Sequence, residues 1–164
     1  MRSIIIGLGN PIVGDDAIAI KVMEHIRDTF SPIKNTKILA DISLAGLGLV
    51  ELIRGYESVI LVDSIQTGKN SVGTVIQLEP EEFSLALHTS HYHNIDLFTA
   101  LEFSNQMYDD VPKNIKIIGI EIINPMEFSD ELSLDLQNKF EEIVNQVYQI
   151  IVQELKEEIT ANIV

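Results

Sequence analysis

The sequence contains no cysteine, and its 11 lysine and arginine residues are outnumbered by 25 aspartate and glutamate residues, giving a formal net charge of −14. The absence of cysteine excludes disulfides, thiolate metal sites and a cysteine nucleophile, and is compatible with a reducing cytoplasm. The few basic residues are scattered, whereas proteins that bind nucleic acids or membrane surfaces cluster them. We therefore expect a cytoplasmic protein whose partners include neither nucleic acid nor a membrane.

Long hydrophobic runs are also missing. The apolar run from Ile4 to Ile6 is far too short for the core of a signal peptide or for a membrane span. Hydrophobic residues nevertheless make up 46% of the 164 residues, which is enough for a buried core. We expect one soluble domain over residues 1–164, without repeats or linkers.

Apolar runs alternate with segments of helical periodicity, a pattern typical of layered α/β domains. Only about ten residues separate the third expected strand from the fourth, too few for a crossover helix, so antiparallel pairing is expected there. The predicted fold is a three-layer sandwich, an about five-stranded, mostly parallel twisted sheet with one antiparallel strand and helices on both faces. Strands are expected at residues 3–8, 37–40, 58–62, 73–78 and 115–120.

Acidic residues follow the expected strands, and the carboxyl ends of parallel strands form the functional crevice of open α/β sheets. The polar segment after the fourth strand adds His91 and His93, so carboxylates and imidazoles are expected to converge on one edge. Such a set can hold a divalent metal, perform acid–base chemistry, or only bind backbone groups in turns. The candidates near the strand ends are Asn10, Asp15, Asp16, Asp41, Asp63 and Glu121.

These candidates differ in how readily a structural role explains them. Asp15 or Asp16 is expected to cap the first helix, which leaves the other for chemistry. Asp63 follows a buried apolar run, where an ionised group is costly unless it is paired or bound. A histidine in a loop is usually only solvated, but two histidines one residue apart also suggest a metal site. By contrast, the glutamates at 79, 81 and 82 are expected in a solvated loop, and the leucines from Leu44 to Leu52 in the core.

The glycine-containing turn Gly7-Leu8-Gly9-Asn10-Pro11 has two alternative interpretations. A dinucleotide-binding fingerprint needs a third glycine where this chain has Ile12, and acids would face the pyrophosphate. The pentapeptide also looks like the start of bacterial peptidyl-tRNA hydrolase, but the Thr-Arg-His-Asn element is absent and the charge is wrong for tRNA. Neither interpretation accounts for the sequence.

The longer stretch from Gly7 to Asp16 resembles the N-terminal signature of the nickel-iron hydrogenase maturation endopeptidases. In that family Gly-Asn, here Gly9-Asn10, is followed after a short spacer by an acidic pair. The resemblance implies that Asp16, Asp63 and His93 form a catalytic, metal-contacting triad, with Gly9, Asn10 and Asp15 in support. His93, Leu97 and Ala100-Leu101 are similar to the family's motif, and His91 is the alternative ligand.

The resemblance extends over nearly the whole chain, through Ala45-Gly46-Leu47 and Ile118-Gly119-Ile120-Glu121. It implies an aspartic-type endopeptidase that removes the C-terminal extension of a hydrogenase large-subunit precursor after nickel insertion. Nickel would arrive with the substrate, and no tightly held cofactor is expected. Either nickel polarises the scissile carbonyl or one carboxylate acts as the base.

The chain departs from the family pattern at Ala17, Ala19 and Ser43-Leu44, close to the expected site. The family usually has glycines at the first two positions and a Gly-Thr pair near the third. These differences leave one alternative, a non-catalytic maturation chaperone of the same fold that binds nickel or the precursor.

Overall fold

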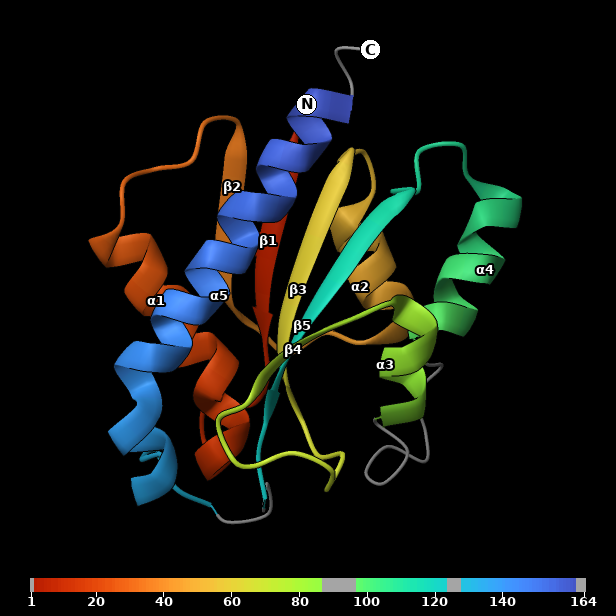
Figure 1. Ribbon diagram of the computed structural model, residues 1–164. Coiled ribbons are helices and arrows are strands. Elements are labelled where there is room, and N and C mark those ends of the chain that lie inside the picture. The colour runs from red at the N-terminus through yellow and green to blue at the C-terminus, as the bar shows by residue number, and fades with distance from the viewer. Residues whose placement is uncertain (1, 87–96, 124–127, 162–164) are drawn as a thin grey trace.

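The computed structural model describes residues 2–86, 97–123 and 128–161, and its strands form one five-stranded sheet in the order β2-β1-β3-β5-β4 (Figure 1). The first four strands in that order are parallel, and β4 is antiparallel to β5. The predicted mostly parallel sheet with one antiparallel strand is confirmed. The strands are β1 Ser3–Leu8, β2 Thr36–Ile42, β3 Ser58–Ile65, β4 Val75–Leu78 and β5 Asn114–Glu121.

The central strands are continuous runs rich in β-branched residues. Helices cover both faces of the sheet, so the side chains on both sides of these strands are buried. All six residues of β1 are buried. Alternate side chains enter different cores, so that Ile60 and Val62 of β3 pack on one face while Val59 and Leu61 pack on the other. This period of two is the geometry of a strand, and it assigns each later residue of β3 to a face.

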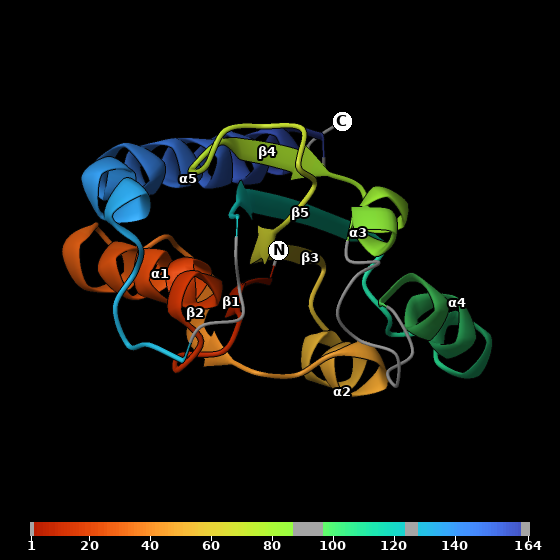
Figure 2. The same ribbon diagram turned by 90° about the horizontal axis from the view of Figure 1, so that it is seen from below.

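Helices cover both faces, which completes the predicted three layers. On one face lie the short 3₁₀ helix η1 Gly14–Ala17, α1 Ile18–Thr29 and α5 Leu134–Ala161. On the other face lie α2 Gly46–Ile53, α3 Pro80–Ala86 and α4 Leu97–Met107. Figure 2 shows the two groups on opposite sides of the sheet. In the described part of the chain, no helix is long and apolar enough to cross a membrane.

The structure corrects the expected course of the third and fourth strands. β3 does not end before Asp63 but continues to Ile65, because its last residues still pair with β5 and Ile65 is buried. The fourth strand is antiparallel as predicted, but its partner is β5 rather than β3. Asp63 is therefore held inside a strand, with a backbone position set by the sheet.

The glutamates at 79, 81 and 82 were expected in a solvated loop, but residues 80–86 form the helix α3. Pro80 occupies the first position, Glu81 and Glu82 lie in the first turn, and Phe83 packs into the core. The Glu82 carboxylate accepts a hydrogen bond from the Glu79 amide at 2.9 Å, which caps the helix. Proline at the first helical position followed by acidic residues was the signal in the sequence.

Candidate active site

The carboxyl ends of the parallel strands meet at the lower edge of the sheet in Figure 1, and Figure 2 looks onto this edge from below. All six predicted non-histidine candidates lie on segments at this edge, but the structure gives them different roles. Asp16 and Asp63 are brought together. His91 and His93 lie outside the described residues.

Asp63 is a partly buried carboxylate near the carboxyl end of β3, on the face covered by α2 and α4. Its backbone is aligned with Gly119 of β5, and its Oδ1 accepts a hydrogen bond from the Ser64 amide at 2.8 Å. Burial, and after it the nearby charge of Asp16, raise the pKa of Asp63 to about 8 against the lowering effect of the Ser64 amide. At neutral pH, and without a bound cation, the Asp63 carboxyl group therefore keeps its proton.

Asp16 lies in η1 on the other face of the sheet, near enough for its charge to raise the pKa of Asp63, and hydrogen bonds orient both of its oxygens. Its Oδ2 accepts from the Asn10 amide at 2.9 Å, and its Oδ1 accepts from the Ser64 hydroxyl at 2.7 Å. Gly9 lets the loop pass close to it, since a Cβ at Gly9, where φ is +144°, would lie 2.3 Å from the Asp16 carbonyl oxygen. The Gly-Asn turn thus positions Asp16.

Ser64, which the sequence analysis did not single out, touches both acids. Its amide donates to Asp63 and its hydroxyl donates to Asp16. The side chain is only 6% exposed. A hydroxyl directly after an acid, in a strand buried on both faces, was the signal that could have identified it.

Asp15 has a structural role that corrects the expected helix cap. Its Oδ1 accepts a hydrogen bond from the Ser133 amide at 2.6 Å, just before α5 begins. The position before α1 is Ala17, which provides no side-chain cap, because the 3₁₀ turn η1 precedes the helix. Neither Asp15 nor Asp16 caps α1, so the prediction of a cap is wrong.

Glu121 and Asp41 do not join the acidic pair. The Glu121 side chain is 1% exposed and accepts from the amides of Thr67 and Gly68, both at 2.8 Å, and from the Thr67 hydroxyl at 2.6 Å. It therefore stabilises the turn after β3. Asp41 is an exposed residue within β2.

The described residues contain no group of three acidic, histidine or cysteine side chains arranged to hold a metal ion. Asp16 and Asp63 supply two carboxylates, which is fewer than a closed metal site requires. The predicted third ligand, His93, and its alternative His91 fall within residues 87–96, which the structure does not describe. The triad remains a prediction.

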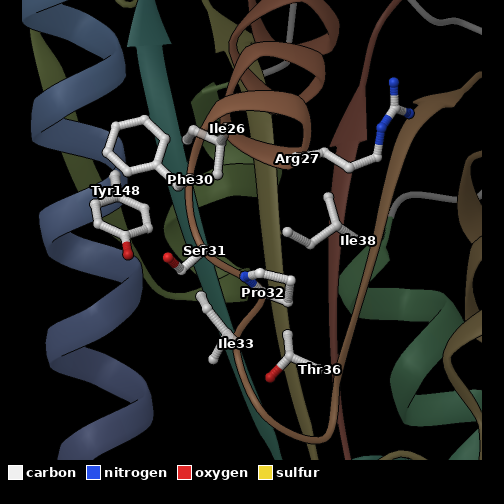
Figure 3. A pocket seen from close by; sticks show the side chains of 9 residues that line it. All are labelled: Ile26, Arg27, Phe30, Ser31, Pro32, Ile33, Thr36, Ile38 and Tyr148. Carbon is white, nitrogen blue, oxygen red and sulfur yellow. The ribbon is translucent and has the colours of Figure 1, made fainter.

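A separate hollow lies at the opposite end of the sheet, between the end of α1, the start of β2 and α5 (Figure 3). Its lining is mainly apolar and includes Phe30, Pro32 and Tyr148. Its charged residue, Arg27, pairs with Asp28 at 2.8 Å. Among the described residues, no carboxylate lines this hollow, in contrast to the acidic edge.

Comparison with known proteins connects this edge to a family. A family model described as hydrogenase maturation protease matches residues 20–154, a range that contains Asp63 and begins shortly after Asp16. The chain belongs to the hydrogenase maturation protease family. As a member of this family it is a hydrolase of peptide bonds, which confirms the prediction of an enzyme.

Individual relatives agree with this assignment. The Hydrogenase 2 maturation protease of Escherichia coli (strain K12) is 29% identical over 125 residues, which cover 73% of each protein. The structure of the hydrogenase maturating endopeptidase HybD from E. coli matches with a TM-score of 0.76 at 24% identity, over 94% of each chain. The [NiFe] hydrogenase maturation protease HycI from Thermococcus kodakarensis KOD1 matches with a TM-score of 0.67 at 20% identity, over 91% of each chain. These two structures establish the shared fold.

Proposed function

We propose that this hydrogenase maturation protease is an aspartic-type endopeptidase that removes the C-terminal extension of a nickel-iron hydrogenase large-subunit precursor after nickel insertion. In this proposal Asp16, Asp63 and His93 recognise the nickel that the precursor carries. The observation that carries the proposal is the joined pair of carboxylates, Asp16 and Asp63, at the active edge of a protease of this family. The absence of cysteine supports a location in the reducing cytoplasm.

The chemistry of the acidic pair suits a metal that arrives with the substrate. Carboxylate oxygens and an imidazole are hard and borderline ligands, which bind divalent nickel without the permanence of a thiolate cage. Two carboxylates alone leave most of the coordination of a metal to other groups. A nickel ion already held by the precursor would bring those groups with it.

Nickel binding also changes the protonation of the pair. Without a cation, burial and the Asp16 charge keep Asp63 protonated at neutral pH. A divalent cation beside both acids favours their ionised forms, so arrival of the nickel-loaded precursor releases the Asp63 proton. Asp63 then becomes available to hold nickel or to accept a proton from the attacking water. A precursor without nickel leaves Asp63 protonated and inactive.

An apolar rim on segments at the same edge of the sheet as the pair suits the docking of a folded protein substrate. We define it as Ile12, Leu44, Leu47, Ile123 and Phe128, five of the eight large apolar side chains that are exposed in the described part of the chain. Leu44 and Leu47 were expected in the core, but both are exposed: Leu44 lies before α2 begins, and Leu47 is on the outer face of α2, which buries its other face through Leu49, Val50 and Ile53.

Hydrogen bonds hold the segments of the apolar rim together. The Ser129 amide donates to the Ile12 carbonyl at 3.1 Å, next to Phe128. The Ser43 hydroxyl donates to the Gly9 carbonyl at 2.9 Å, next to Leu44. These exposed apolar side chains, on segments at the same edge of the sheet as the acidic pair, would contact the body of the precursor while its C-terminal segment crosses the site.

Mass spectrometry of a precursor incubated with this protein tests the proposal. Loss of a C-terminal peptide is expected from the nickel-loaded precursor and not from the nickel-free precursor. Asp63→Asn is expected to abolish that loss while circular dichroism shows an intact fold. Wild-type cleavage by Asp63→Asn would contradict the role of the acid. Complex formation without a mass change in either precursor would contradict the proposed endopeptidase.

A further inference from the structure

We propose that Ser64 is a positioning residue that sets the two proposed nickel-contacting carboxylates, Asp16 and Asp63, in one fixed arrangement. The inference rests on the proposed function and extends it to a residue outside the predicted triad. It is carried by geometry, since Ser64 donates to Asp63 through its amide at 2.8 Å and to Asp16 through its hydroxyl at 2.7 Å.

The backbone of Ser64 is itself held by the sheet. Ser64 is aligned with Ile120 of β5, and the pairing continues on either side of it. The alternation along β3 places the Ser64 side chain on the face of η1 and α1, and the Asp63 side chain on the other face. One residue thus links an acid on the strand to an acid that approaches from the opposite layer. Both carboxylates are therefore positioned relative to the same rigid backbone, that of β3.

The hydrogen bonds to Asp16 still leave oxygen lone pairs for a cation. An ionised carboxylate has about four acceptor sites on its two oxygens. Ser64 occupies one site on Oδ1 and the Asn10 amide occupies one on Oδ2, so one site on each oxygen remains. Two donors on different oxygens also prevent the carboxylate from rotating. Asp16 is therefore oriented by its donors and keeps its capacity to bind metal.

A buried serine that contacts neither acid would have no such effect on cleavage or nickel binding. Ser3, in β1 at the opposite end of the sheet, is equally buried at 3% exposed and provides the matched control. Removing its hydroxyl makes the same chemical change in the same type of element, far from the acids. The comparison separates the loss of a buried hydroxyl from the loss of carboxylate positioning.

The test combines cleavage kinetics with nickel binding for Ser64→Ala, Ser64→Thr and Ser3→Ala. Hydrogen-bond partners of metal ligands typically contribute about 10–100-fold to affinity or activity. We expect Ser64→Ala to lower kcat/KM on the nickel-loaded precursor by that factor, mainly through KM, because recognition of nickel is a binding contact. Calorimetric titration with Ni²⁺ alone should show a similar loss of affinity. Ser64→Thr keeps the hydroxyl and should restore both, and Ser3→Ala should change neither.

The outcomes separate this inference from the proposed function. Wild-type kcat/KM and Ni²⁺ affinity in Ser64→Ala would refute the positioning role while the endopeptidase stands. Equal losses in the Ala and Thr variants of Ser64, or equal losses in Ser3→Ala, would also refute it. If the wild-type protein fails to cleave but binds Ni²⁺ through a Ser64-dependent site, the proposed function is wrong and the positioning role stands. A wild-type protein that neither cleaves nor binds Ni²⁺ refutes both.

Discussion

Asp63→Asn is expected to stabilise the folded protein at neutral pH while it removes cleavage. The wild-type carboxyl has a pKa raised from 3.8 to about 8, first by burial and then by the Asp16 charge. Between these pH values the folded protein keeps a proton that the unfolded chain has lost. A contribution of this sign is fully present at acid pH, and it is lost as the pH rises towards 8. Asparagine cannot ionise, and its carbonyl can still accept from the Ser64 amide.

The magnitude follows from proton linkage. Each pH unit between the unfolded and folded pKa values changes the free energy of unfolding by about 1.4 kcal/mol, so pH 5 to pH 7 amounts to on the order of 2–3 kcal/mol. Other carboxylates titrate in both proteins, and the difference between wild type and Asp63→Asn isolates this one. The advantage of the variant should grow with pH until about pH 8 and then level off.

Urea denaturation of both proteins from pH 5 to pH 9 measures this difference. Asp41→Asn, which neutralises an exposed carboxylate in the edge strand β2, is the control for the loss of one negative charge. Parallel stability curves for wild type and Asp63→Asn would show that Asp63 ionises normally in the fold. That result would refute the argument that burial prevents Asp16 and Asp63 from both being ionised when no cation is bound.

Three further predictions concern the surroundings of the pair. Gly9→Ala should lower the free energy of unfolding by about 1–3 kcal/mol in urea titrations and reduce cleavage, because the new Cβ meets the Asp16 carbonyl; unchanged stability would contradict this contact. Asp15→Asn should cost about 1–2 kcal/mol of stability through its hydrogen bond to the start of α5, yet leave the folded fraction active. Asp16→Asn should abolish cleavage. A precursor assay in which Asp15→Asn abolishes cleavage and Asp16→Asn does not would exchange the two roles. Phe128→Ser in the apolar rim should raise KM about 5-fold or more, and Met107→Ser, at the other end of the molecule, should not; equal KM values would exclude Phe128 from docking.

Most of the fold was predictable because it follows from local hydrophobic patterns. The run from Ser3 to Leu8 was assigned correctly at both ends, since every residue in it is buried and the Gly-Asn-Pro turn stops it. The end of β3 was placed too early because a carboxylate normally closes a buried strand. Here Asp63 lies inside the strand, with a raised pKa in place of a partner charge. The rule failed at the residue proposed for function, where exceptions to folding preferences concentrate.

The convergence of Asp16 and Asp63 was predictable in outline because they lie near the carboxyl ends of the neighbouring parallel strands β1 and β3. Their detailed environment was not. Ser64 contacts an acid 48 positions away, and Asp15 contacts an amide 118 positions away. The hydroxyl next to an acid in a buried strand marks Ser64 as a candidate, but the sequence does not show which distant acid it contacts, nor which of the two adjacent acids, Asp15 or Asp16, holds a helix end.

The sequence by itself determined where most strands and helices lie, which edge collects the acids and which family signature the first loop resembles. These properties depend on side-chain periodicity and turn chemistry within short segments. Only the tertiary structure decided that Asp16 and Asp63 form the pair, that Asp15 and Glu121 hold the framework, and that Ser64 joins the two acids. Those roles depend on desolvation and hydrogen bonds between distant segments, which exist only once the chain has packed.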